Sequence, residues 1–457
     1  MTEKIKETSA LKTAVRVILT FILTAAVCMA LLFITALIPK ERIADSVKES
    51  ADYFYEQELF PCIIDKQFNT RQDNYADSIL VNIMYHISAE NPMHSLIKAA
   101  YYNPEMENVN VSLYESMQED KEPNVEYSRY WHGGMVLLRP LFVFTGIEGA
   151  RMLLGIALFA LTAAVSIILW IKKERLLSVC YILANLIVQV WVCAFCIEYI
   201  TTFLIMNAVI LIFLFLFYKR SSREEFEKNS MYLMAAAGVC TCFFDFLTTE
   251  TITITVPLLI ILILKFHADE LEDMKSEIIH LVRHGIIWGA SYGGMFLLKW
   301  LIAAVVLGKA AFLGALTSAG ERIGGTVHLG NTNLDPEADG LQRFVGALAS
   351  NQGCLFPFRE IMSAAQGMFA FGGIVFLCFC IIYLFRGKNF SPKLIALCML
   401  LSCVPYVRYI VIANHAYIHY FFTYRAQIVT IIALLFCTFE FGIHTLVQTF
   451  LGKKKRK

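Results

Sequence analysis

The stretch VRVILTFILTAAVCMALLFITALI, residues 15–38, decides the class of fold. About 20 consecutive apolar residues are enough to cross the roughly 30 Å hydrocarbon core of a bilayer as one helix. Lysines precede the stretch, and no small-residue cleavage site follows it. We therefore expect a retained first transmembrane helix rather than a cleaved signal peptide.

Similar apolar runs recur along the whole chain, which is 457 residues long, 57% hydrophobic and only 17% charged, with a mean hydropathy of +0.59. A soluble protein has about 25% charged residues. The pattern predicts an all-α polytopic membrane protein with about ten transmembrane helices. The predicted spans are 15–38, 149–171, 177–197, 199–218, 230–247, 249–265, 285–307, 361–385, 393–413 and 427–450.

The distribution of lysine and arginine predicts the orientation in the bilayer. With ten spans, every strongly basic segment falls on one side, which is then the cytoplasm. These segments are the N-terminus 1–14, the connections near 172–175, 219–228, 265–283 and 386–393, and the tail 451–457. We expect an N-in/C-in protein of a bacterial plasma membrane. A basic tail directly after the last span is explained by the orientation of the protein in the membrane. We therefore expect no nucleic acid partner.

Two large segments lie on the other side of the membrane. Segment 39–148 is too long for a plain connector, and its apolar periodicity predicts helices lying on the membrane, with 103–126 as a polar surface loop. The second large segment is 308–360. Spans 2–7 fill 149–307 and spans 8–10 fill 361–450. Cys62 and Cys354 lie in the two outer segments, where a disulfide and two separate thiols are equally compatible with the sequence.

Asp73 and Asp77 are the first pair of residues that could carry chemistry. Four residues apart, they would lie on one face of a helix. Such a pair can supply a general base, or oxygen ligands for a divalent cation such as Mg²⁺ or Mn²⁺. A structural alternative is that Asp73 caps a helix beginning near Tyr75. A capping aspartate can also be catalytic, so both interpretations stay open.

Asp245 and Glu250 lie at the outer join between the predicted fifth and sixth spans, in the sequence FFDFLTTET. Carboxylates at membrane depth are costly and usually face a functional cavity. Here they would contact a sugar or an acceptor. The structural alternative is a short polar turn between two spans.

The segment NHAYIHYFFTYR, residues 414–425, is dense in aromatic rings and hydrogen-bond donors. His415 and His419 have a spacing that zinc can use, but no third ligand accompanies them. An aromatic anchor at the membrane surface is one alternative. The other is a pocket in which Arg425 binds phosphate bidentately and Asn414, His415, Tyr417 and His419 contact sugar or acceptor.

Several further cations lie towards the outer face. Arg408 and Lys299 are just inside spans, from which each could simply snorkel to the headgroups. Jointly, the outer cations can form an anion site for a polyprenyl phosphate headgroup; they are Arg129, Arg139, Arg151, Lys299, Arg408 and Arg425.

A short cytoplasmic start, one span, a long outer loop with an acidic motif and many further spans together resemble the GT-C membrane glycosyltransferases. The resemblance covers about the first 220 residues best. It implies a polyprenyl-phosphate-linked sugar as donor, a cell-envelope glycan or lipid as acceptor, and transfer on the outer face with inversion. By position, the base would be Asp73, with Asp77 second. In several branches of this family two acidic residues stand next to each other in the acidic motif of the first outer loop. The sequence departs from the family because Asp73 and Asp77 do not form such an adjacent pair.

Other functional classes remain compatible with these patterns. A polysaccharide polymerase or ligase also has many spans and outer Arg and His residues, although its large loop usually comes late in the chain. A lipid-linked glycan flippase or transporter would show a charge-lined path deep in the membrane. A scaffold would tolerate Asp73→Asn and Arg425→Ala.

Overall fold

The computed structural model describes residues 2–104, 108–324, 340–356, 362–387 and 389–443. Within these ranges the chain is helical, and its only β pairing is two isolated bridges, Cys62–Arg71 and Tyr101–Val125. Seven stretches among the described residues are long and apolar enough to cross a membrane. The prediction of a helical membrane protein is therefore confirmed.

Seven of the ten predicted spans coincide with these stretches. Five are parts of single helices and two are composite, since the last two spans are interrupted by short breaks. The helices are α1 (Thr2–Ala36), α7 (Ile147–Ile171), α9 (Ile197–Lys219), α12 (Met274–Leu307), α15 (Ala364–Phe385), α16 (Pro392–Ser402) with α17 (Val404–Val411), and α19 (Tyr420–Thr423), η5 (Tyr424–Gln427), α20 (Ile428–Thr438) and η6 (Phe439–Ile443).

The other three predicted spans are helices that fall short by length or composition. α8 (Arg175–Ile187) ends early, just before Gln189 adopts a left-handed φ of 56°. α10 (Arg223–Phe244) is long enough, but its first turns are charged. α11 (Ile252–His267) has 16 residues, about 24 Å at 1.5 Å per residue, and is buried from Ile252 to Lys265. A helix that is apolar all round belongs in the centre of a bundle.

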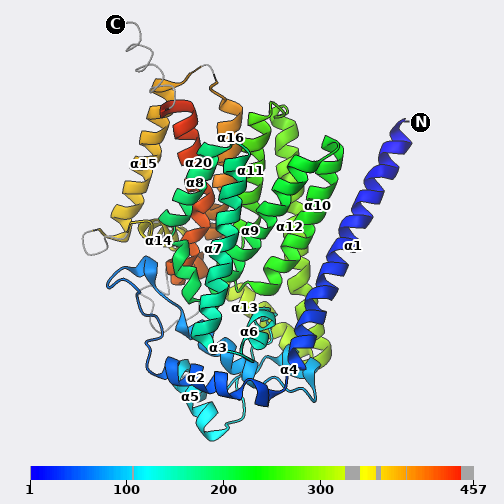
Figure 1. Cartoon of the computed structure of the whole chain (residues 1–457), viewed down its shortest axis with the longest axis vertical. Coiled ribbons are helices and arrows are strands. Elements are labelled where there is room, and N and C mark those ends of the chain that lie inside the picture. Colours follow the sequence, from blue (N-terminus) through cyan, green and yellow to red (C-terminus); the bar gives the residue numbers. More distant parts are fainter. Residues whose placement is uncertain (1, 105–107, 325–339, 357–361, 388, 444–457) are drawn as a thin grey trace.

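The connections predicted to be cytoplasmic meet at one end of the bundle, where α1 also begins (Figure 1). Glu174 pairs with His267, and Arg220 with Glu270. Lys393 donates to the carbonyl of Leu271 at 3.0 Å. These contacts join four connections that are far apart in sequence, as a shared membrane side requires.

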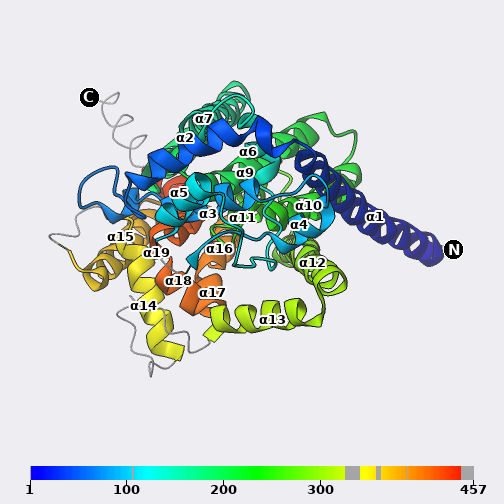
Figure 2. The same cartoon turned by 90° about the horizontal axis from the view of Figure 1, so that it is seen from below.

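The opposite end of the bundle is covered by the two large outer segments (Figures 1 and 2). The first segment forms η1 (Lys40–Arg42), α2 (Ala44–Tyr55), η2 (Phe68–Thr70), α3 (Asn74–Tyr85), α4 (Pro92–Lys98), α5 (Val109–Glu119) and α6 (Met135–Leu141). The rest of this end is formed by η4 (Val190–Phe195), α13 (Lys309–Gly324), α14 (Gly340–Gly353) and α18 (Ala413–Ile418).

Residues 103–126 differ from the predicted surface loop, because they contain the packed helix α5. Three of its polar residues, Asn110, Ser112 and Ser116, are buried rather than solvated. Asn110 accepts a hydrogen bond from Ser78 at 2.6 Å, and Ser112 donates to Asn103 at 2.9 Å. Polar residues that satisfy one another can be buried at little cost, so polarity alone was a poor guide here.

Several predictions fall partly outside the described residues. They are the basic tail 451–457, the end of the span 427–450, residue 361 at the start of the span 361–385, and positions 325–339 and 357–360 of the outer segment 308–360. Cys62 and Cys354 are not joined to each other by a disulfide in the described part of the chain.

Candidate functional site

A cavity of about 260 Å³ lies where the outer stretches of the chain converge. The first outer segment, the start of α9, the turn after α10, the end of α13 and the α18–α19 region each contribute to its wall. We call it the Asp73 cavity. It is lined by Phe60, Asp73, Tyr75, Ala76, Asp77, Ile79, Leu80, Tyr127, Tyr130, His132, Glu198, Phe246, Arg322, His415, His419 and Phe422.

Asp73 is both a helix cap and part of the cavity wall. Its Oδ1 accepts from the backbone N–H of Ala76 at 2.9 Å, which caps α3. Its Oδ2 accepts from the hydroxyl of Tyr199 at 3.2 Å. Burial, aided by the charge of Asp77, raises the pKa of Asp73 to about 7, against the lowering effect of the Ala76 hydrogen bond. The capping interpretation is thus confirmed, and it leaves the carboxyl at the cavity with a pKa suited to proton transfer.

Asp77 is engaged by a permanent partner. Its Oδ2 accepts from Arg151 Nη2 at 2.7 Å and Nε at 2.9 Å, and its Oδ1 accepts from the backbone N–H of Ile197 at 3.0 Å. Arg151 also donates to Asn74 Oδ1 at 2.9 Å. This fully buried network joins α3, α7 and the start of α9. Asp77 is therefore held by Arg151 and helps to fix α3 against α7 and α9.

His415 and His419 stand side by side in the cavity wall, with ring centroids 4.6 Å apart. Burial and the nearby charges of Arg322 and Arg408 lower the pKa of His419 to about 3, and burial likewise lowers that of His415. Both imidazoles are therefore neutral at physiological pH. His415 Nδ1 is buried without a hydrogen-bond partner among the described residues.

Glu198 and Arg322 are cavity residues that the sequence analysis did not select. Glu198 is in the first turn of α9. It could have been found by the argument applied to Asp245 and Glu250, namely a carboxylate at the outer end of a span. Arg322 lies in the last turn of α13, where Nη1 donates to Ser318 O at 2.9 Å. No sequence pattern distinguished it from an ordinary loop cation.

Three predicted phosphate ligands are instead bound to backbone carbonyls. Arg139 donates to Met84 O at 2.6 Å, Ile38 O at 2.7 Å and Ile87 O at 3.3 Å. Lys299 donates to Ile97 O at 3.1 Å. Arg425 donates to Asn69 O at 3.1 Å and Phe421 O at 3.2 Å. Most of these acceptors lie at or near helix ends, where carbonyls lack helical partners and attract cations. None of the three lines the Asp73 cavity.

Arg408, the fourth predicted phosphate ligand, pairs with a predicted sugar ligand. Its Nη2 donates to Glu250 Oε2 at 3.1 Å, in an ion pair that is almost fully buried. Asp245 accepts from the backbone N–H of Thr248 at 3.0 Å and forms the turn between α10 and α11. The polar-turn interpretation of this segment therefore describes the structure, and neither carboxylate lines the Asp73 cavity.

Asn414 and Tyr417 also lie outside the cavity lining. Asn414 Nδ2 donates to Glu321 O of α13 at 3.1 Å. Tyr417 packs against the small buried cluster of Ala347, Tyr409 and Ala416. They fix α18 between α13 and α14, which positions the two histidines.

A second cavity, of about 370 Å³, adjoins the first between α12 and α13. We call it the α12–α13 groove. Tyr130 and Arg322 line both cavities. The groove is otherwise mostly apolar, with Arg129 as its second cation; its further lining is Leu247, Tyr292, Gly293, Phe296, Leu297, Trp300, Ala315, Ser318, Ala319, Ile323 and Ile412. The groove is thus an apolar cavity with two guanidinium groups, those of Arg129 and Arg322, in its wall.

In the described part of the chain, no three His, Cys, Asp or Glu side chains are grouped closely enough to hold a metal ion. Asp77 is in addition occupied by Arg151. Comparison with protein-family models, with curated proteins and with solved structures finds no match to this chain.

Proposed function

We propose that this protein is a membrane glycosyltransferase that uses a polyprenyl-phosphate-linked sugar and acts on a cell-envelope acceptor at the outer face of the plasma membrane. The observation that carries the proposal is Asp73, a buried carboxyl with a pKa near 7 in a cavity formed by the outer segments. A base works best when its pKa lies near the working pH.

In this reaction the acceptor hydroxyl oxygen attacks the anomeric carbon as the bond from that carbon to the phosphate oxygen breaks. Asp73 accepts the hydroxyl proton, and the lipid phosphate leaves with the bonding electrons. One hydrogen bond to each carboxylate oxygen holds Asp73 in place and leaves further lone pairs for the acceptor. Attack opposite the leaving group inverts the anomeric centre.

The phosphate role moves from Arg139, Lys299, Arg408 and Arg425 to Arg322, together with Arg129, which is one of the predicted outer cations. Arg322 borders both cavities, so a headgroup bound there would lie beside Asp73 while its chain follows the α12–α13 groove. Cationic donors stabilise the charge that develops on the leaving phosphate. Glu198 and the neutral His415 and His419 supply acceptors and donors for sugar hydroxyls.

The decisive experiment compares a deletion strain complemented with wild-type protein or with Asp73→Asn, at matched membrane levels. Asparagine caps a helix as well as aspartate does, so the fold should survive. Losing a general base costs about 10²- to 10⁴-fold in rate. We expect Asp73→Asn to reproduce the deletion, with loss of a surface glycan and accumulation of a lipid-linked sugar.

The matched control is Asp273→Asn. Asp273 also caps a helix, accepting from Lys275 and Ser276 at the start of α12, but it lies at the other end of the bundle. It should restore the wild-type profile. A wild-type profile from Asp73→Asn would refute the catalytic assignment and favour transport or scaffolding.

A further inference from the structure

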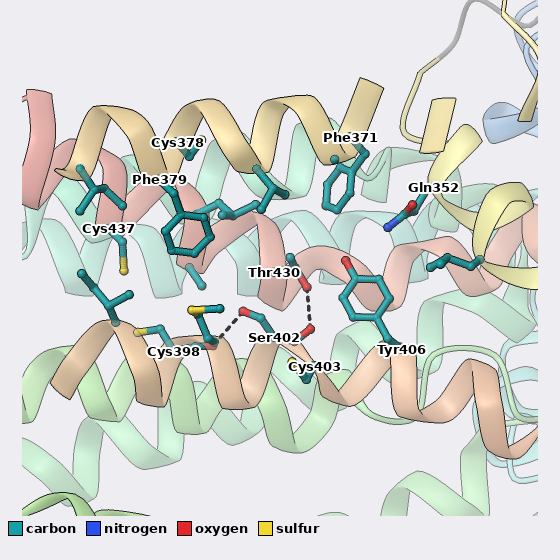
Figure 3. A pocket seen from close by; sticks show the side chains of 18 of the residues that line it. Gln352, Phe371, Cys378, Phe379, Cys398, Ser402, Cys403, Tyr406, Thr430 and Cys437 are labelled. Carbon is teal, nitrogen blue, oxygen red and sulfur yellow. Dashed lines mark hydrogen bonds between the residues drawn. The ribbon is translucent and has the colours of Figure 1, made fainter. Parts of the chain in front are cut away.

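An apolar cavity lies away from the Asp73 cavity, between α15 and α16 with α20 as its floor. Its volume is about 390 Å³, within the range of about 300 to 1,000 Å³ typical of ligand sites. Both α15 and α16 pack on α20, and the cavity lies between them (Figure 3). Neither the transfer reaction nor the α12–α13 groove uses it.

The lining of this cavity is graded in polarity. Gln352, Ser402, Tyr406 and Thr430 lie towards the α14 end, whereas Cys378, Cys398 and Cys437 lie towards the other end (Figure 3). No charged side chain is among the lining residues in the described chain. Such a site offers hydrogen bonds to a neutral polar group at one end and only apolar and thiol contacts beyond.

The length of the cavity matches one leaflet of a bilayer. Its lining on α15 runs from Phe371 to Ile382, about 16 Å along a helix axis, close to half of a hydrocarbon core of about 30 Å. α15 also exposes large apolar side chains, among them Phe369, Phe376 and Leu377. Met399 and Cys403, which line the cavity, are also exposed, so the cavity opens at the surface of the bundle.

We propose that this cavity binds one acyl chain of a membrane glycerolipid, whose ester region reaches Gln352 and Tyr406 at the outer end. A phosphate held within the cavity is disfavoured, since no cation lines it. The ester carbonyl of a glycerolipid needs only a neutral donor, which the Gln352 amide can supply; the Tyr406 hydroxyl donates to Gln427 Oε1 at 3.3 Å. The proposal does not depend on the transferase activity.

The lipid would support the candidate site indirectly. Gln352 follows Asn351, whose Nδ2 donates to Ala416 O at 2.8 Å and whose Oδ1 accepts from Thr423 at 2.7 Å. Ala416 belongs to α18, the helix that carries His415. The same helix α14 thus contacts the lipid on one side and orders the histidine wall on the other.

Two neighbouring glycines allow a matched test. A Cβ at Gly372 or at Gly373 would meet nothing within 4 Å, but only Gly372 lines the cavity. Gly372→Leu should fill the cavity, and Gly373→Leu should add the same side chain outside it. Leucine is favoured over glycine in a helix, so both variants should fold.

The full-length variants are reconstituted in dioleoylphosphatidylcholine vesicles doped with a phosphatidylcholine that carries a diazirine at the end of one acyl chain. After illumination, labelling is mapped on residues 430–437 of α20, which form the floor and are shielded from bulk lipid. We expect labelling in the wild type, in Gly373→Leu and in the inactive Asp73→Asn, and its loss in Gly372→Leu.

Equal labelling of all variants would overturn the proposal. So would labelling of the floor by a diazirine-bearing polyprenyl phosphate but not by the acyl probe, since the occupant would then be the donor chain. Because Asp73→Asn is expected to keep its lipid, failure of the lipid site and failure of the transferase proposal give different results.

Discussion

The two ends of the helical bundle use charge in opposite ways. At the end where the basic connections meet, buried and half-buried charges are neutralised in pairs, such as Lys265 with Glu277 at 2.7 Å. At the other end, Asp77 and Glu250 have arginine partners. Asp73 and Glu198, however, are carboxyls at the cavity that form no ion pair among the described residues.

This difference separates charges that serve stability from charges available for chemistry. A buried carboxyl without a cation weakens the folded state, so its presence in a cavity marks a functional site. Two carboxylates four residues apart show the contrast within one helix turn, since Asp77 is neutralised by Arg151 and Asp73 is not.

The largest effect should come from breaking the ion pair beside the cavity. Arg151→Met leaves Asp77 buried without its cation, which costs about 3 to 5 kcal/mol in such pairs. We expect a markedly lower thermal unfolding temperature in detergent micelles. Adding Asp77→Asn to this variant should recover part of the loss. If Arg151→Met unfolds within about 1 kcal/mol of the wild type, the pair is not structural.

A second prediction concerns the buried ion pair between Lys265 and Glu277 at the other end of the bundle. Lys265→Met leaves Glu277 buried and should destabilise the protein by a similar or somewhat smaller amount, about 3 kcal/mol. Transfer activity per folded molecule should nevertheless stay at the wild-type level, because this pair is far from the cavity. A specific activity as low as that of Asp73→Asn would contradict the division between the two ends.

A third test uses the pH dependence of stability. The pKa of Asp73 is raised from 3.8 to about 7 in the folded protein, so folding binds a proton between these values and stability falls as the pH rises through them. The Asp73→Asn variant has no carboxyl to titrate at this position, so its stability does not fall with pH for this reason. We expect it to be more stable than the wild type by about 1 to 3 kcal/mol near pH 8, with no gain near pH 4. Parallel stability curves for the two proteins would show that Asp73 is not buried as described.

The smallest effect on stability should come from Arg322, which is only half-buried and forms no ion pair in the described chain. Arg322→Gln should change stability by less than about 1 kcal/mol. In an assay with purified lipid-linked sugar, we expect KM for the donor to rise about tenfold, as for one lost charged contact. The KM of Arg322→Lys should lie between those of the wild type and Arg322→Gln, since lysine keeps the charge but cannot bind phosphate bidentately. An unchanged KM in Arg322→Gln would remove this residue from the donor site.

The sequence predicted the class of fold because long apolar helices follow directly from bilayer thickness. It also predicted Asp73 and the two histidines, since these residues combine unusual chemistry with an outer position. It was less informative where a cation faces the outer side. Arg139, Lys299 and Arg425 bind helix-end carbonyls and Arg322 borders a cavity, yet all four look alike in sequence. Which carbonyl or cavity a guanidinium reaches is decided by tertiary packing between segments far apart in the chain.

The buried helix α11 has a consequence for how the protein is made. It is shorter than the hydrocarbon core and enclosed by other helices, among them α9, α16 and α20. The translocon can pass α11 into lipid, but its Thr-rich outer end finds polar partners only in the assembled bundle. α20 is among the last helices to be synthesised. The middle of the bundle is therefore completed only when the last described span has been inserted, so a ribosome-bound nascent chain ending before residue 428 should expose α11 to lipid and to quality-control proteases.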